Sequence, residues 1–219
     1  MPTKPNTLSE EERKAGWTLL FDGKSTRGWR GYKKKDMPAT WKVAGGALVL
    51  EKKAGAEGGD IVTVAEYDRF ELALEWRISP GGNSGIMYHV QESEPYPWQT
   101  GPEVQVLDNA KHADGKNPLT SAGSCYGLYA PEEDVTKPVG QWNQVRLVVR
   151  VPVVEHWLNG DKLLEYELGS ADWNQRVAAS KFKAFPNFGK APKGFIALQD
   201  HGDHVEYRSI KLLPLPPAK

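Results

Sequence analysis

The sequence predicts an all-β protein built as a sandwich of two sheets. Apolar and polar residues alternate over several short runs, and the clearest run is Phe70–Ile78. Turn signals such as Gly45-Gly46 and Asn159-Gly160 separate the runs at short intervals. No sustained helical periodicity, internal repeat or low-complexity block interrupts this pattern. Many short strands in 219 residues therefore favour one β-sandwich domain.

The expected elements can be placed along the chain. Ser9–Lys14 reads as one helical turn, with Ser9 as N-cap and Glu12 at capping-box spacing. Asn109–Ser124 reads as a long loop, and Ala171–Phe188 as irregular or briefly helical. Asp60–Val64 is a short apolar run. We expect strands at Phe70–Ile78, Ser84–Val90, Glu103–Leu107, Trp142–Val151, Val153–Leu158, Lys162–Leu168, Gly194–Asp200 and His204–Leu212.

The alternation also predicts which residues form the core. In each strand, one set of side chains should face the opposite sheet, because successive side chains point to opposite faces. The residues expected to be buried are Leu72, Leu74, Trp76, Ile86, Val104, Val106, Leu147, Val149, Ile196 and Leu198. We divide the chain into a polar segment over residues 1–15, a sandwich domain over 16–213 and an extended tail over 214–219.

Composition excludes several classes of function. Lysine plus arginine and aspartate plus glutamate both number 28, so the balanced charge argues against a nucleic-acid partner. No apolar run approaches the roughly 20 residues of a membrane-spanning helix. Cys125 is the only cysteine, so it cannot form a disulfide within the chain. The first residues lack the apolar region of a signal peptide, which fits a cytoplasmic protein. The polar, proline-containing character of this segment instead favours an exported protein, periplasmic or secreted, whose leader has been removed.

The polar faces of the strands nominate a binding site. Each of these residues lies opposite its strand's apolar positions, and we expect them to line one face suited to a hydroxyl-rich ligand: Glu75, Asn83, His89, Glu103, Gln105, Gln199, His201, Glu206 and Arg208. A solvated outer face is the alternative, in which Glu206 and Arg208 pair with each other or with Glu75. Asp108 is a further candidate that can instead close an Asx turn, and Tyr126 can stack on a sugar or pack in the core.

No strong metal motif is present, since the chain has neither an HExxH sequence nor a CxxC pair. Glu103 and His201 remain candidate ligands for a divalent metal ion, which is the only cofactor that the residues bring into question.

Several segments together resemble the 3-keto-disaccharide hydrolase family, whose members have a concanavalin A-like jelly-roll sandwich. The ordered set GNSGI, EVQVLDN, LNG, LQDHG and VEYR carries the likeness, within longer matches from Gly16 to Leu212. The family often has an arginine where this chain has His89, so the contact made by that arginine does not carry over.

The resemblance implies a carbohydrate substrate already oxidised to a ketone at C3. A base removes the acidic C2 proton, the C1 substituent leaves by elimination, and water adds to give 3-ketoglucose. We expect Glu103 or His201 to act as the base, with the other residue or Glu206 as the proton donor. A non-catalytic carbohydrate-binding module remains an alternative, as does a two-carboxylate glycosidase using Glu103 and Glu206.

Overall fold

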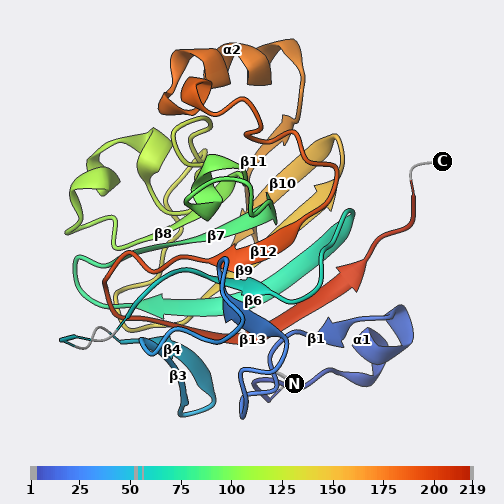
Figure 1. Cartoon of the computed structure of the whole chain (residues 1–219), viewed down its shortest axis with the longest axis vertical. Coiled ribbons are helices and arrows are strands. Elements are labelled where there is room, and N and C mark those ends of the chain that lie inside the picture. The colour runs from blue at the N-terminus through green and yellow to red at the C-terminus, as the bar shows by residue number, and fades with distance from the viewer. Residues whose placement is uncertain (1–3, 52–53, 56, 218–219) are drawn as a thin grey trace.

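The computed structural model describes residues 4–51, 54–55 and 57–217, which form a sandwich of two antiparallel sheets (Figure 1). The larger sheet, sheet A, contains β1 (Thr18–Leu19), β3 (Trp41–Ala44), β4 (Ala47–Leu50), β6 (Phe70–Ile78), β9 (Asn143–Arg150), β10 (Val153–Leu158), β11 (Asp161–Glu167) and β13 (Val205–Pro214). The smaller sheet, sheet B, contains β2 (Trp29–Gly31), β5 (Ile61–Thr63), β7 (Asn83–Val90), β8 (Glu103–Leu107) and β12 (Phe195–Leu198).

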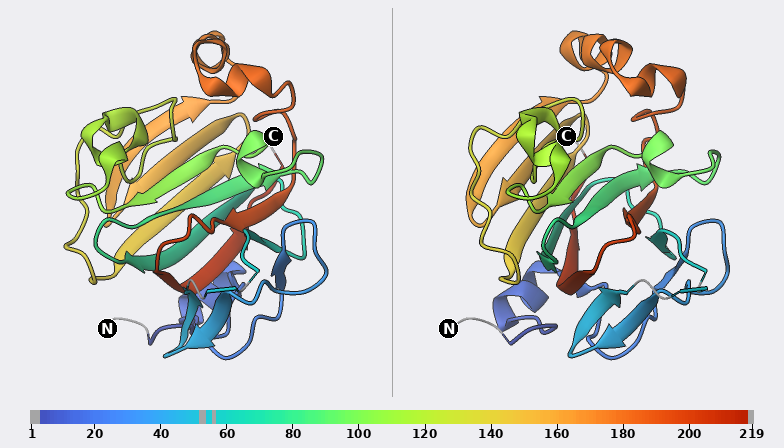
Figure 2. Two further views of the ribbon diagram at one scale, coloured as in Figure 1. Left: turned by 60° about the vertical axis from the view of Figure 1, so that its left-hand side comes forward. Right: turned by 90° about the vertical axis from the view of Figure 1, so that its left-hand side faces the viewer.

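Each sheet combines neighbouring strands that are consecutive in the chain with neighbours from distant parts of it. Sheet A runs β11-β10-β9-β6-β13-β4-β3, with β1 paired to β13, and sheet B runs β2-β5-β12-β7-β8. The sheets stack face to face (Figure 2), and apolar side chains from both fill the space between them. The predicted all-β jelly-roll sandwich is therefore confirmed, and every residue predicted for the core is at most 4% exposed.

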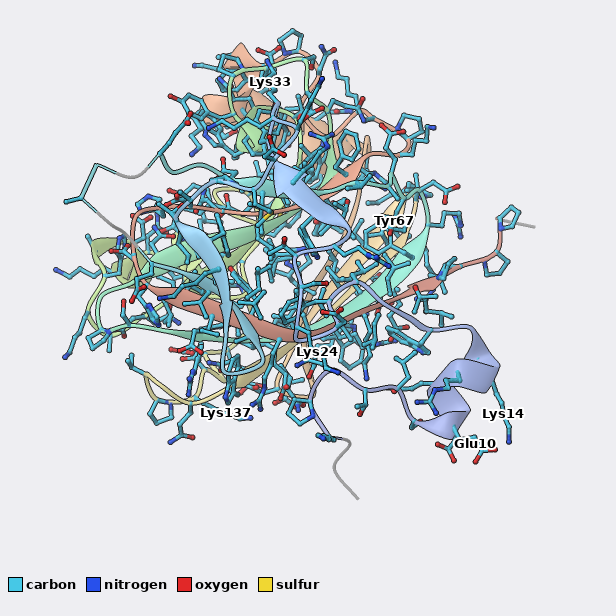
Figure 3. All side chains as sticks on the ribbon, turned by 60° about the horizontal axis from the view of Figure 1, so that its bottom comes forward. Glu10, Lys14, Lys24, Lys33, Tyr67 and Lys137 are labelled. Atoms are coloured by element: carbon cyan, nitrogen blue, oxygen red, sulfur yellow. The ribbon has the colours of Figure 1, made fainter. Side chains whose placement is uncertain are left out.

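Short helices close the sandwich at its two ends (Figure 1). Helix α1 (Glu10–Ala15) begins at Ser9, whose side chain forms the predicted capping box with Glu12. Figure 3 shows Glu10 and Lys14 projecting from α1 into solvent, where they form an ion pair of 2.8 Å. Helix α2 (Ala171–Ala179) and the 3-10 turn η4 (Lys181–Ala184) lie at the other end of the molecule.

Three further 3-10 turns lie in the loops that follow β7 and β8. They are η1 (Pro97–Gln99), η2 (Ala113–Lys116) and η3 (Pro118–Thr120). The loop expected at Asn109–Ser124 thus contains two short turns. The predicted hairpins join β3 to β4 and β10 to β11, and Asn159 and Gly160 both have positive φ at the second turn. Within the described ranges, no helix is long and apolar enough to cross a membrane.

One expectation about strand β7 is wrong. Regular alternation would place His89 on the outer face with Met87, but β7 has a bulge opposite β12, and His89 has a φ of 52°. The bulge moves Val90 onto the outer face beside Met87. The His89 ring instead packs on Phe70, and its Nε2 lies 2.7 Å from the Asp68 carbonyl oxygen. His89 is therefore a buried packing residue.

Candidate functional site

Glu103 occupies the outer face of sheet B at the start of β8. Its carboxylate lies over Gly85 of the neighbouring strand β7, where a Cβ atom would approach Glu103 Oε1 to 2.0 Å. Gly85 pairs with Gln105 on one side and accepts a hydrogen bond from the Gln199 backbone N–H on the other, at 2.9 Å. The missing side chain at Gly85 thus gives the Glu103 carboxylate room between two glutamines.

The Glu103 carboxylate is buried without a direct partner. The residue is 7% exposed, and within the described part of the chain its carboxylate has no hydrogen bond and no ion pair. Burial raises the pKa of Glu103 to about 8, with a lowering contribution from the charge of Lys181 and raising contributions from Asp60 and Asp114. Such a carboxyl group exchanges a proton near neutral pH, as proton-transfer catalysis requires.

Lys181 supplies the positive charge that lowers the pKa of Glu103. Its ammonium nitrogen lies 4.5 Å from the ring centres of both Trp98 and Tyr126, and 5.3 Å from that of Phe182. Although the residue as a whole is exposed, its ammonium is enclosed by three rings. This desolvation lowers the pKa of Lys181, while Glu103 and Asp114 act in the opposite direction.

Tyr126 and Asp114 join this group to the loops above β8. The Tyr126 backbone N–H donates to the Glu103 carbonyl, and its hydroxyl donates to Asp114 Oδ2 at 3.3 Å. Burial, with Asp114 and Glu103 nearby, raises the pKa of Tyr126 to about 12, so the phenol stays neutral. We call Glu103, Lys181, Tyr126, Asp114, Trp98 and Gln199 the Glu103 cluster.

His201 lies at the rim, in the loop that follows β12. Its ring meets that of His112 edge to face at 6.2 Å, and His112 Nδ1 accepts from the Asp114 backbone N–H. Asp203 of the same loop accepts a hydrogen bond from the Asn83 backbone N–H at 3.1 Å. His201 therefore stands beyond the Asn83 end of β7, whereas Trp98 belongs to the opposite end.

Asp60 adds a second carboxyl group with a raised pKa. Burial raises the pKa of Asp60 to about 6; the hydrogen bond from the Asp200 backbone N–H opposes this change, and the Asp200 charge adds to it. Asp60 affects the titration of Glu103 through its charge. It is a candidate that the sequence analysis did not name.

Of three residues predicted to bind substrate, two use their side chains in structural hydrogen bonds and one has a buried side-chain oxygen without a partner in the described part of the chain. Gln105 is 1% exposed, and its amide nitrogen donates to the Thr120 carbonyl under η3. Asp108 accepts from the backbone N–H groups of Gly81 and Ala110, so it forms the Asx-type contacts considered from sequence. Asn83 is 3% exposed, and its side-chain oxygen has no hydrogen-bond partner among the described residues.

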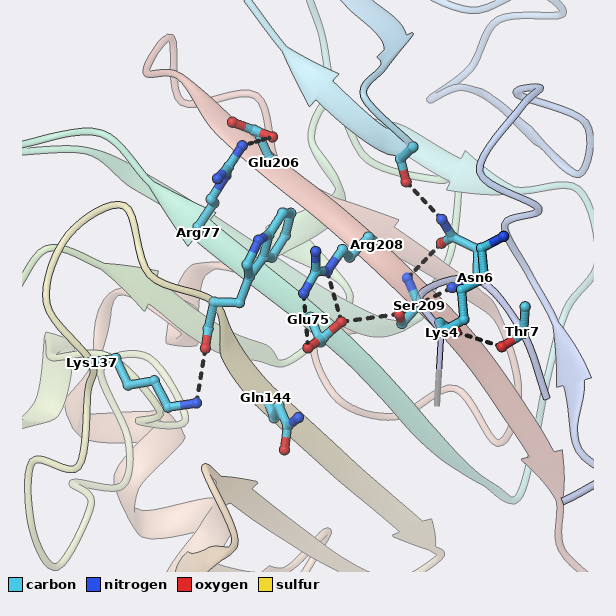
Figure 4. Close-up of polar contacts among 12 residues, drawn as sticks. Lys4, Asn6, Thr7, Glu75, Arg77, Lys137, Gln144, Glu206, Arg208 and Ser209 are labelled. Carbon is cyan, nitrogen blue, oxygen red and sulfur yellow. Dashed lines mark hydrogen bonds and ion pairs between the residues drawn. The ribbon is translucent and has the colours of Figure 1, made fainter. Parts of the chain in front are cut away.

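The structure separates Glu75, Glu206 and Arg208 from the Glu103 cluster. All three lie on β6 and β13 of sheet A, on the face turned away from sheet B (Figure 4). Arg208 pairs with Glu75 at 2.8 Å, and Arg77 pairs with Glu206 at 2.8 Å. The expectation of one shared polar face is wrong, because alternation shows that a residue points away from the core without showing which sheet carries it.

This separation excludes two roles proposed from sequence. Glu206 cannot donate a proton to a sugar held at Glu103, and the two carboxyl groups cannot flank one glycosidic bond as a glycosidase pair. Sheet A does carry a groove of about 770 Å³ beside Glu75, Gln144 and Arg208. The acidic group in this groove, Glu75, already has a basic partner in Arg208. Burial acts to raise the pKa of Glu75, but the hydrogen bonds and the charge of Arg208 outweigh the effect of burial and lower this pKa.

Sequence reasoning missed Lys181 and Gly85. Lys181 follows α2 in a stretch expected to be irregular, where no periodicity indicates a direction for its side chain. The closely spaced Phe182, Phe185 and Phe188 are the available signal, because they indicate that this segment packs against the body. The sequence shows Gly85 only as a glycine within a strand. Its role becomes visible when β8 pairs with β7, because the Glu103 carboxylate then lies over it.

The two proposed metal ligands do not gather a coordination set. Among the described residues, no three His, Cys, Asp or Glu side chains are placed to hold a metal ion together. Glu103 has the charged neighbours described above, and His201 has Asp203 at 3.7 Å. The residues present do not fit a conventional protein-held metal site, and the chemistry below uses none.

Comparison with known proteins identifies relatives over most of the chain. Residues 16–213 match the family model described as the 3-keto-alpha-glucoside-1,2-lyase-like domain. A 3-keto-disaccharide hydrolase of Bacteroides thetaiotaomicron is 36% identical, covering 90% of this chain and 78% of that protein. A crystal structure from Parabacteroides distasonis, of a candidate glycosyl hydrolase, is 38% identical with a TM-score of 0.89, covering 97% and 100% of the two chains.

A more distant comparison bears on the fold alone. A Bacillus subtilis protein of unknown function with a galectin-like fold has a TM-score of 0.57 at 12% identity, covering 98% of this chain and 96% of that one. Its similarity agrees with the two-sheet jelly-roll architecture.

Proposed function

The chain belongs to the 3-keto-alpha-glucoside-1,2-lyase-like family, and on that premise we propose that it cleaves 3-keto-glucosides, including 3-keto-disaccharides. The observation that carries the proposal is the buried Glu103 carboxyl, with a pKa near neutrality and a desolvated ammonium beside it. A ketone at C3 makes the C2 hydrogen acidic, so one weak base and one proton donor are sufficient for elimination.

Glu103 is the base in this mechanism. Its carboxylate takes the C2 proton, and the C2–H electron pair forms an enolate whose negative charge develops on the C3 oxygen. The enolate then expels the C1 oxygen substituent, leaving a double bond between C1 and C2. A carboxyl with a pKa of about 8 is a stronger base than an ordinary glutamate.

Lys181 is the proton donor for the leaving oxygen. C1 is adjacent to C2, so an ammonium close to the base can reach the bond that breaks. The lowered pKa makes Lys181 a stronger acid than an ordinary lysine. Neutral Lys181 then takes a proton from the water that adds to C1. Protonated Glu103 exchanges its proton with solvent when water enters the site, and it then delivers a proton to C2. The sum is hydrolysis, and both groups recover their starting states.

The rest of the Glu103 cluster orients the sugar. C3 and C1 lie on opposite sides of C2, so the ketone oxygen points away from Lys181, toward Gln199 and His201. The Gln199 amide nitrogen and the His201 ring are hydrogen-bond donors suited to the developing enolate oxygen. This arrangement gives His201 a place at the ketone, in preference to the acid–base role considered from sequence.

Matched glucosides with and without the 3-keto group test the proposal. In heavy water, the 3-keto substrate should give 3-ketoglucose with deuterium at C2, because elimination breaks the C2–H bond and hydration replaces it. The unoxidised glucoside should not react. Equal activity on both substrates, or product that retains its C2 hydrogen completely, would reject elimination. Binding without turnover of either substrate would support a carbohydrate-binding module.

A further inference from the structure

The ring of Tyr96 lies unusually open to solvent at one edge of the Glu103 cluster. Tyr96 is 57% exposed, and within the described part of the chain only Val64 and Val139 are other large hydrophobic side chains in that class. Its ring is stacked on that of Trp98, with 6.3 Å between centres and 13° between planes. One aromatic ring thus supports another whose own surface is available to a ligand.

Trp98 connects this ring to the reacting groups. Its ring centre lies 4.5 Å from the Lys181 ammonium, and Phe185 packs against it edge to face at 5.1 Å. Lys181 in turn affects the titration of Glu103. Tyr96 and Trp98 therefore form a row that leads outward from the proposed proton donor, on the side opposite to His201.

The loop that carries the two rings is fixed by polar contacts. The Tyr96 backbone N–H donates to Gln99 Oε1 at 2.8 Å, and the Tyr32 hydroxyl donates to the Glu94 carbonyl at 2.6 Å. Arg30 forms two hydrogen bonds to the Glu92 carboxylate at the start of the loop. A ring held in this way loses little conformational entropy when a ligand stacks on it.

We propose that Tyr96, supported by Trp98, is the binding site for the ring of the leaving group. This rests on the proposed function for the identity of that ligand: with C1 directed to Lys181, the C1 substituent continues along the row toward Tyr96. The site takes a ring with an apolar face, which is either a second hexopyranose or an aromatic aglycone. Substrates with such a ring are bound more tightly than simple alkyl glycosides.

Three substrates and two variants test this site. Tyr96→Ala should raise KM by about 3- to 10-fold for a 3-keto-disaccharide and for an aryl 3-keto-glucoside, as expected for the loss of one stacking partner. Tyr96→Phe retains the ring and should behave as the parent protein does. The methyl 3-keto-glucoside has no ring to stack, and its KM should change by less than about 2-fold. An effect with only one of the two ring substrates would identify which kind of ring the site takes.

Two outcomes would overturn the proposal. One is an equal rise in KM for the methyl and ring-bearing substrates, since a general loss of structure does not discriminate between them. The other is unchanged kinetics with all three. Binding of an unoxidised disaccharide, followed by saturation-transfer NMR, separates this inference from the reaction. Binding that depends on Tyr96, together with no turnover of any of the three 3-keto substrates, would support the site and reject the proposed function.

Discussion

Glu103 on sheet B and Glu75 on sheet A are both strand glutamates, but they differ in their partners. Both project from the outer face of a sheet. Glu75 accepts hydrogen bonds from Arg208 and Ser209, and these contacts keep its pKa low despite partial burial. Glu103 is more deeply buried, has no such donor within the described residues, and has a pKa of about 8. The outer face of sheet A thus carries paired charges, whereas the outer face of sheet B carries a carboxyl group that is available for proton transfer.

The same difference separates the two lysines at these faces. Lys211 on sheet A forms an ion pair with Glu12 and lies 5.6 Å from the ring centre of Trp17. Lys181 near sheet B is surrounded by rings, and its pKa is lowered. Residue type alone therefore does not distinguish a structural charge from a reactive one; the partner and the degree of desolvation do.

The largest effect should come from removing the carboxyl group of Glu103. Glu103→Gln keeps the shape of the side chain but cannot accept the C2 proton, so turnover should fall by about 10²–10⁴-fold. Glu75→Gln and Glu206→Gln make the same chemical change on sheet A and should stay within about 3-fold of the parent kcat/KM, because both side chains lie on sheet A, paired with Arg208 and Arg77. A larger loss from either control would contradict the assignment of the two faces.

Removal of the Lys181 ammonium should have the next largest effect. Lys181→Met should lower kcat by about 10²-fold with an alkyl leaving group, which departs poorly without a proton. The loss should shrink with a nitrophenyl leaving group, because that oxygen needs less protonation. Lys211→Met is the control on sheet A. Equal losses with both leaving groups would reject Lys181 as the proton donor and leave it a role in binding alone.

The fold could be predicted from sequence because alternation reports burial directly. Phe70–Ile78 alternates in the sequence, and its burial alternates residue by residue in β6. The site could be predicted only in part. Alternation identifies Glu103 as a polar residue that points away from the core. Glu75 and Glu206 show the same alternation with apolar neighbours, and only strand pairing places them on the other sheet. The His89 bulge and the Lys181 loop depend on long-range packing that periodicity does not encode.

The position of the Glu103 carboxylate over Gly85 gives a smaller, more specific effect. Gly85→Ala would place a methyl group against Glu103 Oε1, so the carboxylate must move away from the bound sugar. We expect turnover to fall by about 10-fold, since a displaced base is less effective but still present. The double variant Glu103→Gln/Gly85→Ala should be no slower than Glu103→Gln alone. Additive losses would show that Gly85 acts independently of this carboxylate.

The smallest expected effect is on stability, and its sign differs between the two faces. The folded protein raises the pKa of Glu103, so between the unfolded value and about 8 the folded state binds more protons than the unfolded chain. Folding is therefore most favoured at the acid end of this window, and the stability that Glu103 contributes is lost as pH rises. The predicted loss is about 1 kcal/mol between pH 6 and pH 7.

Glu75 and Glu206 have lowered pKa values, so their stabilising contribution is present above their unfolded pKa and is lost as pH falls through the folded one. Urea unfolding of the parent, Glu103→Gln and Glu75→Gln at pH 6 and pH 7 measures the difference. Across this interval, the change in stability should be about 1 kcal/mol more negative for the parent and for Glu75→Gln than for Glu103→Gln. If all three proteins lose the same amount, Glu103 does not titrate near pH 8, and its assignment as a base with a raised pKa fails.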